Sequence, residues 1–102
     1  MIDFIKGLFK PRADFLKLVK EGAVTIDVRT KGEYQAGHIE GSKNVPLDTV
    51  KNEAAALKKL NKPVITVYRS GNRSGMAKSI LATEGIEVYN GGAWTSLKRQ
   101  IQ

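Results

Sequence analysis

The chain has 102 residues, the size of one domain with one hydrophobic core, and its composition, 41% hydrophobic and 26% charged, is that of a water-soluble globular protein. Its net charge of +7 favours anionic partners but does not identify them. Cysteine is absent, which excludes disulfides, thiolate metal sites and cysteine nucleophiles.

The basic residues are spread along the chain and form no dense run, so we interpret most of them as solvated surface and nucleic-acid binding as a weak hypothesis. No apolar run is long enough to span a bilayer, and Asp3 and Lys6 interrupt the stretch where a secretory signal needs apolar residues. We therefore expect a cytoplasmic monomer that requires no metal and no cofactor.

The N-terminal part predicts two helices and a strand. Residues 2–10 have the apolar spacing of a short amphipathic helix, either a membrane or partner anchor or, as we favour, a turn that closes over the core. Residues 14–20 predict a second helix with Gly22 at its end. The apolar run over residues 23–28 predicts a strand buried on both faces of a parallel sheet, with Asp27 at its C-terminal end.

The middle of the chain predicts two helical segments separated by a short strand. Thr30 and Glu33 have the spacing of a capping box, so a short helix should begin at Thr30. The single histidine, His38, is predicted to be a buried hydrogen-bonding residue, because no second histidine could share a metal with it. Residues 45–46 predict a brief strand, and residues 47–60 contain good helix formers.

The C-terminal third repeats the alternation of strand and helix. Residues 64–67 predict a buried strand, residues 74–84 a helix and residues 86–89 a last strand. The inward face of that helix is assigned to Met76, Ala77, Ile80 and Leu81. Residues 90–92 predict a flexible turn, and a basic helix follows from Trp94, which we expect to pack against the sheet.

Helices that alternate with short buried strands predict the α/β class. The expected architecture is a small, open, mostly parallel sheet flanked by helices on both faces, with right-handed crossovers. One domain spans residues 1–102, and residues 1–12 form its amphipathic N-terminal extension.

The loop that follows the strand at residues 64–67 predicts an anion-binding site. Its residues are Arg69, Ser70, Gly71, Asn72, Arg73 and Ser74. A helix start offers unpaired N–H groups and a partial positive charge, and glycine lets such groups turn toward an oxyanion. The two arginines add permanent positive charge suited to sulfur or phosphorus oxyanions. They also repel each other unless an anion or a carboxylate neutralises their charge.

Several separated motifs resemble those of the rhodanese-like (sulfurtransferase) domain family. In chain order they are Asp27-Val28-Arg29, Glu33-Tyr34, Gly37-His38-Ile39 with Gly41, Asn44 and Pro46, the loop from Arg69 to Ser74, and Gly91-Gly92 with Trp94. Each motif alone is weak, but together they are specific, and they cover residues 23–97. The resemblance implies a small parallel sheet between helices, with an active loop that joins a strand to a helix.

The resemblance also implies that the nucleophile is missing. In active members of the family a cysteine ends that strand, five residues before the second arginine of the loop, and accepts sulfur from a donor such as thiosulfate. Here that position is Tyr68. A phenol, with an ordinary pKa of about 10, cannot form a persulfide, and its rigid ring reaches past the centre of the loop. No catalytic residue is then intact.

For the remaining motif residues the resemblance implies structural roles. Asp27 and Arg29 would belong to a polar network beneath the site, with Arg29 paired to Glu33. His38 and Trp94 would likewise support the fold.

Two functions stay open at this stage. One is a catalytically silent module that binds a small oxyanion or a protein partner through residues 69–74. The other is an enzyme, a thiosulfate-type sulfurtransferase or a phosphatase-like relative, if Tyr68 replaces an active cysteine in an otherwise active protein.

Overall fold

The computed structural model describes residues 14–102, so the predicted N-terminal extension and its helix over residues 2–10 lie outside the part that can be compared. The elements in chain order are α2 (Phe15–Lys20), β1 (Val24–Asp27), α3 (Lys31–Ala36), β2 (Lys43–Asn44), the 3-10 turn η1 (Leu47–Thr49), α4 (Val50–Lys59), β3 (Val64–Tyr68), α5 (Gly71–Thr83), β4 (Val88–Ala93) and α6 (Trp94–Ile101). No helix in residues 14–102 is long and apolar enough to cross a membrane.

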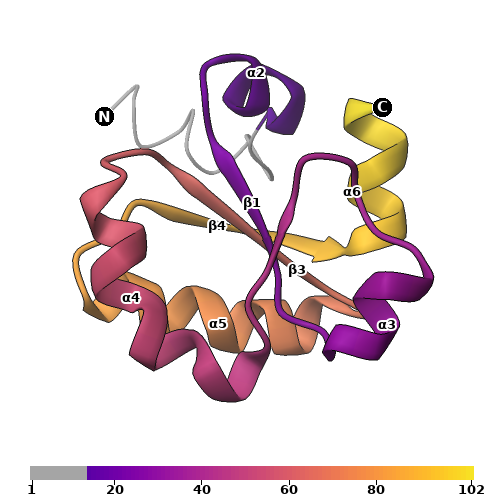
Figure 1. The fold of residues 1–102 in the computed structure, drawn as a ribbon. Coiled ribbons are helices and arrows are strands. Elements are labelled where there is room, and N and C mark those ends of the chain that lie inside the picture. Colours follow the sequence, from indigo (N-terminus) through magenta and orange to yellow (C-terminus); the bar gives the residue numbers. More distant parts are fainter. Residues whose placement is uncertain (1–13) are drawn as a thin grey trace.

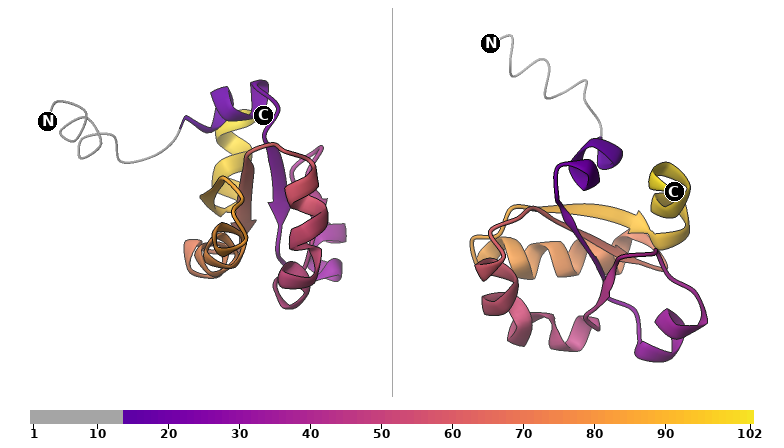
Figure 2. Two further views of the ribbon diagram at one scale, coloured as in Figure 1. Left: turned by 90° about the vertical axis from the view of Figure 1, so that its left-hand side faces the viewer. Right: turned by 45° about the horizontal axis from the view of Figure 1, so that its top comes forward.

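The four strands form one all-parallel sheet in the order β2-β1-β3-β4, with helices on both of its faces (Figures 1 and 2). Helices α4 and α5 pack on one face, where they bury Leu57, Ala77 and Leu81 against the sheet. Helices α2 and α6 cover the other face with Phe15 and Leu97. The predicted α/β class and the open parallel sheet are therefore confirmed.

Strand β3 lies at the centre of the sheet and shows why these residues form a strand. Its first four residues are fully buried, and alternate side chains enter opposite faces, as a period of two requires. Val64 belongs to the core under α4 and α5, whereas Ile65 and Val67 belong to the core under α2 and α6.

The C-terminal ends of the strands meet at one edge of the sheet. Asp27 at the end of β1 is paired with Val67 of β3 and with Asn44 of β2, and Tyr68 at the end of β3 is paired with Ala93 of β4. Because the strands are parallel, the loops that follow β1 and β3 leave from the same edge, where sites form in open α/β sheets.

Two predicted strand positions were wrong. The short strand is residues 43–44 and not 45–46, because the side-chain amide of Asn44 donates to the backbone oxygens of Asp27 and Arg29 and fixes the register there. The predicted turn at residues 90–92 is part of β4, since Gly91 lies so close to β3 that an added Cβ would stand 2.8 Å from a methyl of Ile65.

Helix α5 begins earlier than predicted, at Gly71 instead of Ser74, so most of the predicted loop is the first helical turn. Its buried stripe consists of Ser74, Ala77 and Leu81, at spacings of three and four residues. Met76 lies to the side of this stripe and is 48% exposed, so its predicted inward orientation was wrong.

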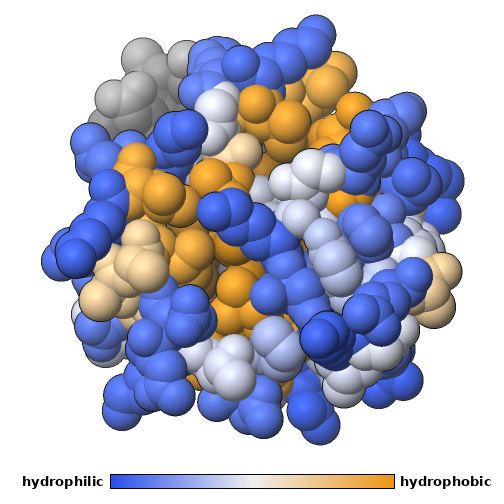
Figure 3. Space-filling view, in the orientation of Figure 1, coloured by the Kyte–Doolittle hydropathy of each residue, from blue (hydrophilic) through white to orange (hydrophobic). Residues whose placement is uncertain are grey.

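Hydrophobic surface gathers over two areas of the face seen in Figure 1, one between β1 and α4 and one between α2 and α6, amid mostly hydrophilic surroundings (Figure 3). The first area adjoins a strand edge, because β2 pairs with β1 only at Ile26 and Asp27. The N-terminal half of β1 therefore has no pairing with β2.

Candidate functional site

The predicted anion-binding residues surround the start of α5. Tyr68 ends β3, Arg69 and Ser70 connect it to α5, and Ser70 is the N-cap residue but makes no capping hydrogen bond with its side chain. By helical geometry the backbone N–H groups of residues 70–73 have no partner inside the helix. The positive end of α5 therefore lies beside Tyr68.

Tyr68 lies close to both arginines of this segment. Its ring is half-buried against the core under α4 and α5, and the guanidinium carbons of Arg69 and Arg73 lie 5.5 Å and 5.9 Å from the ring centroid. Nη2 of Arg69 also donates a long hydrogen bond, 3.4 Å, to the phenol oxygen. Both separations are within the range of cation–π attraction, so the ring attracts each of the two guanidiniums.

One of the two arginines forms an ion pair with a carboxylate. Nε of Arg69 lies 3.2 Å from Oε2 of Glu33, at the start of α3, and both side chains are partly exposed. The predicted capping box is present, because Thr30 and Glu33 exchange hydrogen bonds. These bonds from Thr30, followed by the charge of Arg69, lower the pKa of Glu33.

Arg29 does not pair with the Glu33 carboxylate, so that prediction was wrong. The guanidinium of Arg29 instead holds Asp27, with Nη2 2.7 Å from Oδ2, and both side chains are buried. Asp27 is the nearer partner because its carboxylate also accepts the backbone N–H of Arg29, which turns the chain at this point. Glu33 contributes only its backbone oxygen, at 3.4 Å.

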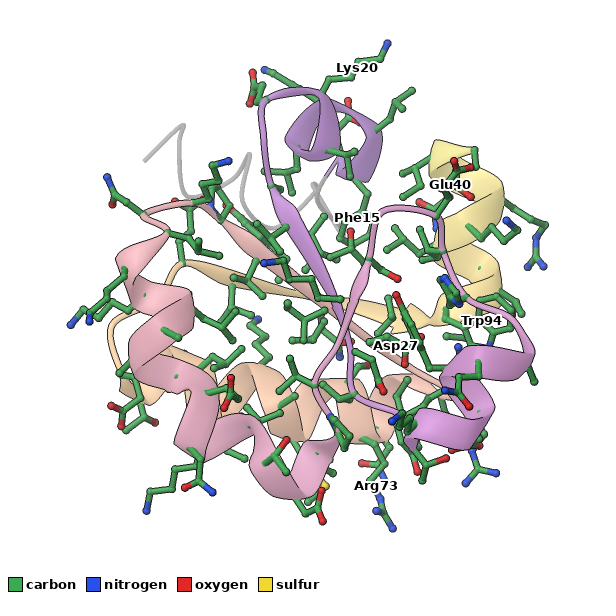
Figure 4. The ribbon with its side chains drawn as sticks, in the orientation of Figure 1. Phe15, Lys20, Asp27, Glu40, Arg73 and Trp94 are labelled. Atoms are coloured by element: carbon green, nitrogen blue, oxygen red, sulfur yellow. The ribbon has the colours of Figure 1, made fainter. Side chains whose placement is uncertain are left out.

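The predicted network beneath the site includes Trp94. The Arg29 guanidinium lies 4.3 Å from the Trp94 ring and donates a hydrogen bond of 2.6 Å to the backbone oxygen of Gly37. Figure 4 shows Asp27 and Trp94 near each other on the right of the view, with Arg73 extending away below them. Trp94, at the start of α6, thus lies against the segment after α3 and packs on the core under α2 and α6.

His38 is exposed, so its predicted burial was wrong. Its ring stacks on Tyr34 with centroids 3.8 Å apart, and Nδ1 lies 2.7 Å from the Tyr34 backbone oxygen. The predicted hydrogen-bonding role is therefore present on the surface. In residues 14–102 no group of three or more histidine, aspartate and glutamate side chains could hold a metal ion.

The side chain of Ser74 is directed away from the predicted anion site. It is fully buried, and its hydroxyl donates to Oδ1 of Asn90 at 2.5 Å, while the backbone oxygen of Ser70 lies 3.3 Å from the same hydroxyl oxygen. These contacts attach α5 to β4. By contrast, Ser70, Asn72 and Arg73 are exposed at the start of the helix.

A depression of about 350 Å³ adjoins Tyr68. It is lined by Val28, Thr30, Pro46, Leu47, Asp48, Tyr68 and Arg73. Sequence analysis missed the contribution of Pro46, Leu47 and Asp48. Strand β2 pairs with β1, and η1 follows β2, so the sheet order brings these three residues to the site. No local sequence motif indicates this placement.

An all-parallel sheet whose central strand enters a helix through an arginine-bearing turn defines a rhodanese-like α/β domain. The sequence profile of the Rhodanese-like domain matches residues 12–96, and the chain belongs to that family.

Particular relatives include two thiosulfate sulfurtransferases. PspE of Escherichia coli K12 is 36% identical over 91 residues, which cover 87% of this chain and 88% of PspE. GlpE of Pseudomonas fluorescens is 35% identical over 74 residues, covering 72% of this chain and 67% of GlpE. Among solved structures, a rhodanese with anions from E. coli is 36% identical, has a TM-score of 0.67, and matches 74% of this chain and 91% of its own.

Proposed function

We propose that this protein is a non-catalytic rhodanese-like module that binds a small oxyanion or a protein partner at the start of α5. The observation that carries the proposal is Tyr68, the last residue of β3, which precedes an arginine-bearing helix start in a chain without any cysteine. We assign Tyr68 to the position of the usual nucleophile. A persulfide needs a sulfur atom there, and a phenol does not supply one.

Anion binding is supported by chemistry that does not depend on the missing thiol. The free N–H groups at the start of α5 and the exposed guanidinium of Arg73 are donors suited to an oxyanion. A solved rhodanese with 36% sequence identity is described with anions, which agrees with this assignment. Arg69, Ser70, Gly71, Asn72 and Arg73 are the proposed contacts, with Ser74 as a buried support.

The proposal is tested by titrating the protein with sulfate and thiosulfate and following backbone amide shifts by NMR. We expect saturable shifts at residues 69–73, and no thiosulfate:cyanide sulfurtransferase activity above a protein-free control. Measurable turnover by the pure protein would refute a non-catalytic role.

The alternative function is a thiosulfate-type sulfurtransferase in which Tyr68 stands in for an active cysteine. It is favoured by the relatives PspE and GlpE, which are described as thiosulfate sulfurtransferases. The Tyr68→Cys variant tests which of the two functions, non-catalytic binding or sulfur transfer, the site can support. If the segment keeps an active-loop shape, the new thiol should react rapidly with iodoacetamide, because a helix N-terminus and nearby arginines lower a thiol pKa.

The matched control for this variant places cysteine at an exposed position remote from the site, such as Ser79→Cys on α5. Equal alkylation rates for the two thiols at neutral pH would show that the loop does not activate a thiol. Sulfur transfer by Tyr68→Cys, and none by the unaltered protein, would show that the tyrosine alone accounts for the loss.

A further inference from the structure

We propose that the depression beside Tyr68 binds an acidic peptide segment of a partner protein, in which one carboxylate side chain is flanked by apolar side chains. The inference rests on the proposed function, because it names the class of ligand for the same site.

The depression is larger than a single inorganic oxyanion needs. Its volume of about 350 Å³ exceeds what one inorganic oxyanion fills and lies within the usual range of ligand pockets, roughly 300 to 1,000 Å³. An oxyanion bound at the start of α5 would leave most of this space to solvent. A side chain with its backbone fits the volume better.

The lining of the depression is largely apolar. Pro46 and Leu47 contribute aliphatic surface, and the ring of Tyr68 contributes aromatic surface. An apolar side chain placed here would remove this surface from water, whereas an inorganic anion would not. The peptide therefore needs an apolar residue next to its charged one.

One cation at the site has no carboxylate partner in the part of the chain that the structure describes. Arg29 is paired with Asp27, and Arg69 is paired with Glu33. Across residues 14–102 no carboxylate lies within ion-pair distance of Arg73, although Arg73 is exposed and lines the depression. Arg73 is therefore the group that we expect to receive the carboxylate, in a fork-like arrangement.

Met76 supplies independent support for a protein ligand. It is the most exposed of the three large hydrophobic residues exposed in the described part of the chain, at 48%. It follows Arg73 by three residues on α5, so the two side chains share one side of the helix. Methionine adapts its shape to apolar partners, and here it extends the apolar surface past Arg73.

Asp48 determines how the peptide would lie. It is exposed and lines the same depression as Arg73, so a carboxylate ligand is attracted at one part of the site and repelled at another. The peptide carboxylate should therefore lie toward α5 and its apolar neighbour toward η1. The net charge of +7 adds a general attraction for acidic partners.

The experiment titrates the isotope-labelled full chain with three end-blocked pentapeptides: GLEFG, GLQFG without the charge, and GAEAG without the large apolar side chains. Sodium sulfate is titrated separately. We expect GLEFG to cause saturable amide shifts at residues 46–48 and 68–76. The other two peptides should bind about two- to fivefold more weakly, the range for one exposed charge contact or a few apolar contacts.

Variants locate the charge contact. Arg73→Gln should weaken GLEFG about two- to fivefold, while Lys78→Gln, which removes the same charge five residues further along α5, should leave the affinity unchanged. Asp48→Asn should strengthen GLEFG binding by removing the repulsion. Equal affinities of GLEFG and GLQFG, or equal effects of Arg73→Gln and Lys78→Gln, would overturn the inference.

The sulfate titration distinguishes the peptide site from the proposed anion-binding function. Sulfate-induced shifts at residues 69–73 without a specific GLEFG response would overturn the peptide site and leave the proposed anion-binding function standing. The absence of both responses would overturn both.

Discussion

The carboxylate of Glu33 is held at the start of α3 by Thr30 and lies 3.2 Å from Nε of Arg69, so α3 and the β3–α5 connection are joined by one ion pair. The pair links α3, which follows β1, to the connection that follows β3 at the same edge of the sheet. Arg69 is therefore paired with a carboxylate, whereas Arg73 is not paired with one in residues 14–102. The two arginines of the segment thus have different roles.

The pKa of Glu33 should respond more to Thr30 than to Arg69. The largest causes of its lowered pKa are the two hydrogen bonds from Thr30, and the charge of Arg69 is a smaller one. Thr30→Ala keeps the bond from the backbone N–H of residue 30 but removes the hydroxyl bond, which is a larger cause than the charge of Arg69. It should therefore raise the Glu33 pKa toward its ordinary value of 4.5 by more than Arg69→Gln does. A carbon-detected NMR titration measures both, and the opposite order would show that the ion pair dominates.

The lowered pKa of Glu33 also predicts how the stability of the protein depends on pH. Because folding lowers the pKa of Glu33, its contribution is complete above the unfolded value and is lost as the pH falls through the folded value. Thr30→Ala should lower the free energy of unfolding by about 1 kcal/mol at neutral pH, as for other N-cap residues. Urea denaturation at pH 7 and pH 3 should show a smaller difference between the two proteins at pH 3.

The buried ion pair of Asp27 and Arg29 should be strongly coupled. Asp27 is fully buried, so Asp27→Asn leaves the Arg29 guanidinium without its counter-charge and should cost about 3–5 kcal/mol. The double variant with Arg29→Met should be destabilised by less than the sum of the two single variants, because it leaves no uncompensated charge. Chemical denaturation measures the cycle. Glu53→Gln, at an exposed position of α4, is the control and should change stability by less than about 0.5 kcal/mol.

Two glycine substitutions should act in opposite directions. A Cβ at Gly91 would lie 2.8–2.9 Å from Ile65, Thr66 and Val67, so Gly91→Ala should destabilise the protein by about 1–3 kcal/mol. A Cβ at Gly32 in α3 would meet nothing within 4 Å, so Gly32→Ala should stabilise it by up to about 1 kcal/mol through helix propensity. Thermal unfolding of both variants checks the contrast, and a stable Gly91→Ala protein would show that β4 can move away from β3.

Features fixed by short-range interactions could be predicted from the sequence. The capping box of Thr30 and Glu33 depends on residues three apart, and the buried strand at residues 64–67 depends on its own apolar run. Both were confirmed. The sheet class followed from the alternation of such segments, and the glycine of the αL turn after α2, Gly22, marked that helix end.

Features fixed by contacts between distant segments could not be predicted. Gly91 reads as part of a turn until β3 is placed against it, and Met76 reads as core until Ser74 is seen to occupy the buried stripe of α5. For both residues a tertiary contact decided between local alternatives. The partner of Arg29, by contrast, is local, because the carboxylate of Asp27 two residues earlier accepts the backbone N–H of Arg29.

The two serines at the start of α5 should differ in their effect on stability. The Ser74 hydroxyl is buried and bonded to Asn90, so Ser74→Ala should cost about 1 kcal/mol. Ser70 has the N-cap position but makes no side-chain capping bond, so Ser70→Ala should change stability by less than about 0.5 kcal/mol. Urea denaturation compares them. A larger loss for Ser70→Ala would mean that its hydroxyl caps α5 in solution.

The ring of Tyr68 should matter more for stability than its hydroxyl. The hydroxyl accepts only a long hydrogen bond from the exposed Arg69, so Tyr68→Phe should change the free energy of unfolding by less than about 0.5 kcal/mol. The half-buried ring packs on the core under α4 and α5, so Tyr68→Ala should cost about 1–2 kcal/mol, part of the value for a fully buried aromatic side chain. Chemical denaturation measures both variants. If Tyr68→Phe were as damaging as Tyr68→Ala, the phenol oxygen and its contact with Arg69, and not the packing of the ring, would hold this edge of the sheet together.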